Sequence, residues 1–260
     1  MKRAAIAALL VSPGLAMAAP FDGTWVMDTS TVQWVEAKPA TFLLDDGSFT
    51  CGRCTPPFTV AADGAPHEVQ GHNNYDRAVV SVSDTRDVTV SAEKGITRVW
   101  MSHFRVSSDG NRLTEEFIQH QGGKLARSTL KYTRTAGAPS GAHAISGSWL
   151  ADPKSLVLTP EQATITFQET AGGLRMSNPL GASFDARFDG KPYPIKGDPT
   201  LTTVSVERVG PAKLRETNTS NGMVNDILTM EVLEDGLSMS VEVEHEPTGA
   251  AWKYIMKKTS

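Results

Sequence analysis

The sequence is poor in cysteine, in aromatic residues and in surplus positive charge. Of its 260 residues 2 are cysteine and 7% are aromatic, and 25 lysines and arginines stand against 29 aspartates and glutamates. Such a charge balance argues against nucleic acid and against anionic membrane surfaces as partners. The apolar run at residues 4–11 is too short to span a bilayer, and no later run is longer. We therefore expect neither a nucleic-acid partner nor membrane insertion.

The N-terminus has the three parts of a Sec-type signal peptide. Lys2 and Arg3 precede the apolar run, a Ser-Pro-Gly break follows it, and Ala16 and Ala18 are the small residues that a signal peptidase needs. Residues 1–18 are therefore predicted to be removed. No cysteine lies at the cleavage point to carry a lipid anchor. The mature product is expected to be soluble and either periplasmic or secreted.

An internal duplication organises the rest of the chain. Residues 21–25 read Phe-Asp-Gly-Thr-Trp, and residues 145–149 read Ile-Ser-Gly-Ser-Trp. Downstream of each motif, turn-forming residues recur at nearly the same spacing, which is typical of repeated modules. We predict one domain from 19 to 134, a linker of small residues from 135 to 144, and a second domain from 145 to 260.

The composition and the turns favour strands in both copies. Valine, threonine and serine are spread along the chain, and Asp-Gly turns such as Asp109-Gly110 and Asp235-Gly236 punctuate it. Residues 237–245 alternate between apolar and polar side chains, as a half-buried strand does. About eight strands per copy in up-and-down order are predicted. The fold class is therefore all-β, with two tandem antiparallel up-and-down β-barrels.

These features resemble the lipocalin (calycin) family. A Gly-x-Trp at the start of a β-meander, with a basic residue late on the last strand to cover the tryptophan, is similar to the lipocalin signature. The mature chain as a whole resembles tandem lipocalin-like proteins exported by Gram-negative bacteria. The resemblance implies small barrels, often with a ligand-sized lumen. It pairs Trp25 with Arg134, and Trp149 with Lys257 or Lys258. Because a buried aromatic residue is usually part of the core, each tryptophan is expected to close one end of its barrel.

The two cysteines, Cys51 and Cys54, are predicted to form a local disulfide, because an exported protein meets an oxidising environment. A zinc site remains the alternative, since these cysteines with His67 and His72 reproduce a two-Cys two-His spacing. Glycines and a proline between the two pairs would break the helix that such a finger needs. We therefore expect no metal and no cofactor.

Counting back from the hairpin turns predicts which inward side chains face each other. In the second copy Asp226 faces His245, which gives an ion pair at the hairpin end furthest from its turn. In the first copy Phe104 faces Glu115, and Phe117 faces Ser102. A carboxylate on an inward face is costly unless it is paired, so Glu115 meets either a partner or a polar ligand. The competing interpretations are that the strand twists outward at this position or that a β-bulge shifts its register.

These inward residues give the functional hypotheses. The leading one is a binding protein for a small lipophilic molecule, with the candidate site residues Trp100, Phe104, Glu115, Phe117, Asp226 and His245. A hydrolase or isomerase-type enzyme that uses Glu115 or the Asp226–His245 pair is the first alternative. An envelope scaffold with solid barrels is the second. The sequence does not indicate an oligomeric state.

Overall fold

The computed structural model describes residues 19–72, 74–121, 123–137, 139–198, 202–220 and 222–260. The predicted signal peptide, residues 1–18, lies outside the described residues. The described chain folds into strands apart from one short helix, α1 (Pro160–Ala163). This confirms the all-β prediction. With four residues, that helix is far shorter than a membrane span, and no other helix lies in the described ranges.

Two ten-stranded antiparallel sheets make up the molecule. The first sheet contains β2 (Ala40–Asp45), β3 (Ser48–Cys51), β4 (Phe58–Ala61), β5 (Pro66–Glu68), β6 (Arg77–Val82), β7 (Asp87–Lys94), β8 (Thr97–Val106), β9 (Arg112–Gln121), β10 (Lys124–Ala136) and β11 (Gly147–Leu158). The second contains β1 (Gly23–Glu36), β12 (Thr164–Thr170), β13 (Gly173–Ser177), β14 (Ser183–Arg187), β15 (Tyr193–Pro194), β16 (Thr203–Gly210), β17 (Lys213–Ser220), β18 (Met223–Val232), β19 (Ser238–His245) and β20 (Ala250–Lys258).

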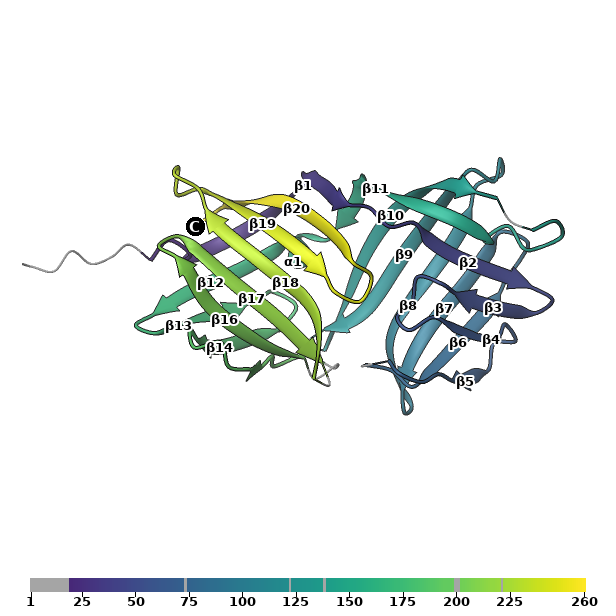
Figure 1. Ribbon diagram of the computed structural model, residues 1–260, viewed down its shortest axis with the longest axis horizontal. Coiled ribbons are helices and arrows are strands. Elements are labelled where there is room, and N and C mark those ends of the chain that lie inside the picture. The colour runs from purple at the N-terminus through teal and green to yellow at the C-terminus, as the bar shows by residue number, and fades with distance from the viewer. Residues whose placement is uncertain (1–18, 73, 122, 138, 199–201, 221) are drawn as a thin grey trace, which may run out of the picture.

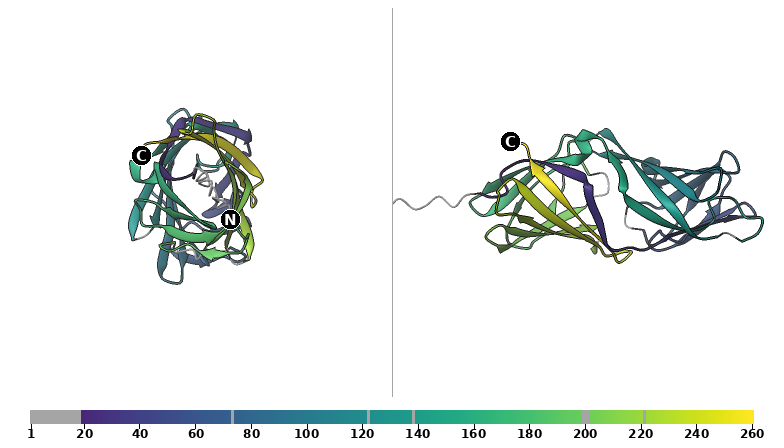
Figure 2. Two further views of the ribbon diagram at one scale, coloured as in Figure 1. Left: turned by 90° about the vertical axis from the view of Figure 1, so that its left-hand side faces the viewer. Right: turned by 90° about the horizontal axis from the view of Figure 1, so that it is seen from above.

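Each sheet curls until its two edges approach, so the prediction of two tandem barrels is confirmed. In the first sheet β4 lies against β6, and in the second β14 lies against β16. An isolated antiparallel bridge between Ser183 and Lys196 helps to close the second barrel. Viewed along the long axis, the strands form a ring (Figure 2). Each barrel thereby encloses its own apolar core.

The two barrels exchange their first strands. In strand order the first sheet runs β4-β3-β2-β11-β10-β9-β8-β7-β6-β5, and the second runs β14-β13-β12-β1-β20-β19-β18-β17-β16-β15. Strand β1 thus lies between β12 and β20 of the second copy, where purple meets yellow in Figure 1. Strand β11 takes the corresponding place between β10 and β2. The predicted domains, 19–134 and 145–260, are therefore wrong at their first strands.

The predicted linker is also misplaced. The chain passes between barrels at residues 37–39 and 159–163, whereas residues 137–146 connect β10 to β11 within the first barrel. This connection is bonded to its own barrel. The backbone N–H of His143 donates to the carbonyl of Leu44 at 2.9 Å, and the Ser146 hydroxyl also bonds Leu44. The first barrel is consequently one continuous segment, and the second is assembled from both ends of the chain.

Strand exchange also swaps the partners of the two signature tryptophans. Trp25 lies beneath Lys258, whose Nζ is 5.2 Å from the ring centroid, and Trp149 lies beneath Arg134 at 4.0 Å. The predicted pairs were the reverse, because each copy was expected to keep its own first strand. Both tryptophans are fully buried. Each is part of the apolar core of the barrel in which it lies.

The glycine of each Gly-x-Trp is required by backbone geometry. Gly23 has φ 123° and Gly147 has φ 127°, a region that side chains rarely adopt. A Cβ on Gly23 would lie 2.2 Å from the carbonyl oxygen of Ser260, and one on Gly147 would lie 2.6 Å from that of Ala136. Glycine therefore allows β1 to approach the end of β20, and β11 to approach the end of β10, so that each tryptophan is buried in the barrel.

Candidate ligand-binding site at the barrel junction

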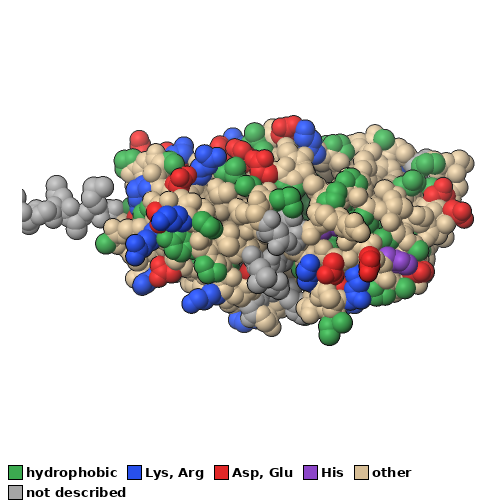
Figure 3. Space-filling model, turned by 60° about the horizontal axis from the view of Figure 1, so that its bottom comes forward, with side chains coloured by type: hydrophobic (Ala, Val, Ile, Leu, Met, Phe, Trp, Pro, Cys, Tyr) green, Lys and Arg blue, Asp and Glu red, His purple; other side chains and the backbone are tan. Residues whose placement is uncertain are grey.

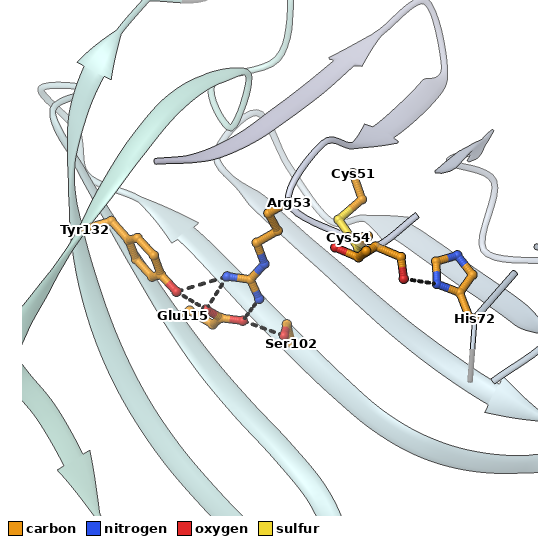
Figure 4. Close-up of a disulfide and its surroundings, with 8 residues drawn as sticks. Cys51, Arg53, Cys54, His72, Ser102, Glu115 and Tyr132 are labelled. Atoms are coloured by element: carbon orange, nitrogen blue, oxygen red, sulfur yellow. Dashed lines mark hydrogen bonds and ion pairs between the residues drawn. A yellow bond between two sulfur atoms is a disulfide. The ribbon is translucent and has the colours of Figure 1, made fainter. Parts of the chain in front are cut away.

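A disulfide-closed turn directs one arginine into the first barrel. Cys51 and Cys54 are joined, as predicted, and the turn between them presses on the neighbouring strand. A Cβ on Gly52 would lie 2.1 Å from the Thr41 hydroxyl, so only glycine fits there. With the turn fixed on both sides, the side chain of Arg53 extends into the lumen (Figure 4).

Arg53 meets the inward carboxylate of Glu115. Its two terminal nitrogens lie 2.9 Å and 2.5 Å from the two carboxylate oxygens, in the bidentate arrangement that suits a guanidinium. Its guanidinium also lies 5.4 Å from the ring centroids of both Phe42 and Phe104. Glu115 is thus inward and paired, and the interpretation that its strand turns outward is wrong.

Two further donors complete the network around Glu115. The hydroxyl of Ser102 donates to it at 2.7 Å and that of Tyr132 at 2.5 Å (Figure 4). Burial alone would raise the pKa of Glu115, but the charge and hydrogen bonds of Arg53, with those of both hydroxyls, hold it below its usual range. Glu115 is therefore an ionised structural partner with its oxygens already engaged, and it is poorly placed to accept a substrate proton.

Aromatic rings form the walls above this network. The Tyr75 and Trp100 rings meet edge to face with centroids 5.7 Å apart, and Phe117 lies 6.2 Å from Trp100. His72 stacks on Tyr75 at 4.2 Å. The Nδ1 of His72 lies 3.1 Å from the Thr55 carbonyl, and burial lowers the pKa of this imidazole. A neutral ring that donates through Nδ1 leaves Nε2 as an acceptor, and Nε2 is buried without a partner among the described residues.

The second barrel supplies the remaining wall. Asn225, Asp226, His245, Pro247 and Thr248 line the same pocket as Trp100 and Phe117. Asp226 and His245 face each other across β18 and β19, as predicted, with Oδ1 and Nδ1 2.8 Å apart. The Thr55 hydroxyl donates to the Pro247 carbonyl at 3.2 Å, which ties the disulfide turn to the second barrel. The open ends of the two barrels therefore face each other across this pocket.

The pocket has a volume of about 370 Å³. Trp100, Phe104, Phe117, Asp226 and His245, all chosen from the sequence, line it, and Glu115 is bonded to the lining residues Arg53 and Ser102. The predicted register of Phe104 with Glu115 and of Phe117 with Ser102 is confirmed. Sequence reasoning placed these residues in two separate lumens, whereas the structure brings both sets into one pocket. The difference arises because the two barrels exchange their first strands and because their open ends face each other.

Arg53, His72 and Tyr75 are among the pocket residues that the sequence did not predict. Arg53 stands inside the Cys-x-x-Cys segment, which was interpreted for its sulfur atoms alone. Two features of the sequence could have indicated its role. Arg53 lies between two linked cysteines, and the predicted inward Glu115 had no assigned partner. The sequence pattern marks His72 only as a zinc ligand and does not mark Tyr75, because both lie in an irregular segment between β5 and β6.

The zinc alternative is wrong. The thiols that would bind the metal are joined to each other with sulfur atoms 2.07 Å apart. His67 bonds Asp63 at 2.9 Å, and His72 bonds the Thr55 carbonyl instead. Within the described ranges no three histidine, cysteine or acidic side chains are gathered to hold a metal ion.

Comparison with known proteins adds no assignment. A scan against models of protein families finds no match, and a search of curated proteins finds no similar sequence. The function is therefore inferred from the geometry of the junction pocket.

Proposed function

We propose that the protein is a lipocalin-like binding protein that holds a small lipophilic molecule in the junction pocket. The observation that carries this proposal is a partly open hollow of about 370 Å³, lined by aromatic rings and by Arg53, whose charge is balanced by Glu115. Apolar walls with a few polar groups are typical of small-molecule sites. A hollow of this size supports binding over a scaffold with solid barrels.

The cellular location belongs to the same proposal. The predicted signal peptide directs the chain to the periplasm or outside the cell, where the Cys51–Cys54 disulfide persists. A soluble carrier of a poorly soluble molecule is a natural role there. The acidic excess of the sequence supports a small-molecule ligand over nucleic acid.

An enzyme is the second candidate, and one observation favours it. The carboxylate of Asp226 bonds the imidazole of His245 inside the pocket, an arrangement that can orient a histidine as a general base. Native mass spectrometry of protein purified from its own periplasm separates the two candidates. A binding protein retains one compound unchanged on incubation, whereas an enzyme converts it.

A blocking substitution at the mouth tests the binding proposal. Thr248 lines the pocket, and Glu246 is exposed in the same turn outside it. N-phenyl-1-naphthylamine, a neutral lipophilic dye, should bind the wild-type chain at one equivalent with enhanced fluorescence. Thr248→Trp should weaken it at least about tenfold by filling the mouth, and Glu246→Trp should leave it unchanged. Equal affinity in both variants, or no binding to the wild type, would refute the proposal.

A further inference from the structure

The charges of the first barrel cancel at the floor of the pocket. The guanidinium of Arg53 is matched by the carboxylate of Glu115, whose partners Ser102 and Tyr132 are neutral hydroxyls. His72, on the wall, is held neutral by burial, which lowers its pKa. A ligand in this half of the pocket therefore meets aromatic rings and no net charge.

The second barrel presents a row of acceptors that leads away from the pocket. Asp226 on the pocket wall lies directly opposite Asn218 in the neighbouring strand. The side-chain amide of Asn218 donates to Glu216 at 3.1 Å, one layer deeper. The other amide atom, Oδ1 of Asn218, is buried without a partner among the described residues. A buried acceptor without a donor is costly, and a donor from a ligand would satisfy it.

The charge of this row is not balanced by the protein. His245 bonds Asp226 and not Glu216, and Glu216, 8% exposed, has no cationic partner in the described part of the chain. Burial, opposed by the Asn218 hydrogen bond and assisted by the charge of Asp226, raises the pKa of Glu216 to about 7. A cation nearby would favour its ionised form, so the site is complementary to positive charge.

We propose that the ligand of the junction pocket is an aromatic or otherwise apolar molecule with a cationic amino group. The apolar body lies among Trp100, Phe117 and Tyr75, and the ammonium group points toward Asp226, Asn218 and Glu216. Its three N–H donors suit two carboxylates and the orphaned carbonyl, and the electron-rich rings favour a nearby cation. This inference rests on the proposed binding function and adds the chemical class of the ligand.

Three probes that share one ring system test the inference. They are 1-naphthylmethylamine, 1-naphthalenemethanol and 1-naphthoate, titrated into the full chain by calorimetry at pH 8. The amine should bind about tenfold more tightly than the alcohol, because it gains charge-assisted hydrogen bonds. Naphthoate should bind more weakly than the alcohol, because its charge has the same sign as that of the acceptor row.

Near-isosteric variants test which residues cause the preference for the amine over the alcohol. Asp226→Asn and Glu216→Gln should each reduce the advantage of the amine, and the double variant should abolish it, while the affinity for the alcohol stays within about twofold. Glu244→Gln, which removes an exposed outward carboxylate from β19, is the matched control and should change nothing.

The outcomes separate this inference from the function on which it rests. If the alcohol and the amine bind equally, or naphthoate binds most tightly, the cationic class is wrong while the binding function stands. An amine preference that survives in the double variant also overturns the assignment. If none of the three probes binds, the proposed function falls, and the inference falls with it.

Discussion

Arg53 and Glu115 lie 62 residues apart in the chain and form a largely buried ion pair in the first barrel. Removing one partner of such a pair leaves the other charge uncompensated. Glu115→Gln is therefore expected to lower the free energy of unfolding by about 3 kcal/mol in urea denaturation. Adding Arg53→Met to that variant should recover part of the lost stability, because it removes the guanidinium that no longer has a partner. Strictly additive losses in the double variant would contradict the pairing.

Glu216 gives the stability a pH dependence of known sign. Its folded pKa of about 7 lies above its ordinary value of 4.5, so the folded chain binds this proton more tightly. The resulting stabilisation is complete below the unfolded pKa and is lost as pH rises through the folded one. We expect the free energy of unfolding to fall by roughly 3 kcal/mol between pH 4.5 and pH 7.5 from this group.

The matched variant isolates that contribution. Glu216→Gln cannot ionise, so its free energy of unfolding should decline less than that of the wild type over this range. Glu244→Gln should keep the wild-type profile, since Glu244 is exposed on the outer face. Parallel wild-type and Glu216→Gln curves would show that Glu216 titrates normally in the folded chain. Asp226, His245 and Tyr254 face the same interior and remain present in every variant.

At the scale of the strands, exchange determines which fragments fold. Residues 37–158 contain all ten strands of the first barrel in one segment. We expect this fragment to unfold cooperatively on its own in urea, monitored by tryptophan fluorescence. Residues 159–260 lack β1, which lies between β12 and β20, and should not fold alone.

A circular permutant supplies the missing strand. The backbone N–H of Thr24 donates to the carbonyl of Ser260 at 2.8 Å, so a short turn can join residue 260 to residue 19. The chain 159–260 followed by 19–36 should therefore fold with a cooperative transition. If residues 145–260 fold alone, with β11 taking the place of β1, the exchange seen here is not required by the sequence.

Local sequence patterns are sufficient to predict which residues of neighbouring strands face each other. Period-two alternation and Asp-Gly turns fixed the register that sets Asp226 opposite His245 and Phe104 opposite Glu115. The exchange was not predictable in this way, because both copies begin with the same Gly-x-Trp pattern. Either first strand fits either barrel by that pattern, and the choice depends on contacts between segments more than a hundred residues apart.

The long-range contact of Arg53 was hidden for the same reason. Its neighbours predict a tight turn, and nothing local indicates that the side chain enters the barrel and meets Glu115. The residues chosen from the sequence line or contact the pocket, but they do not include all of its lining. The side chains that complete the pocket come from turns and irregular segments, where periodicity carries no information.

At the scale of the whole molecule, Trp25 and Trp149 each lie in the core of one barrel, and residues of both barrels line the junction pocket. Acidic and basic side chains are interspersed over the face shown in Figure 3, without one dominant sign. The pocket walls come from both copies, so the proposed ligand site requires the assembled pair of barrels.

Photolabelling with benzophenone tests whether the two barrels share one ligand site. Benzophenone is a neutral aromatic compound small enough for a hollow of about 370 Å³, and on irradiation it inserts into nearby C–H bonds. Peptide mapping by mass spectrometry should place the adducts in two segments, 98–119 of the first copy and 223–250 of the second, and N-phenyl-1-naphthylamine should suppress both. Adducts confined to one copy, or spread over the surface and insensitive to the competitor, would contradict a ligand site shared by the two barrels.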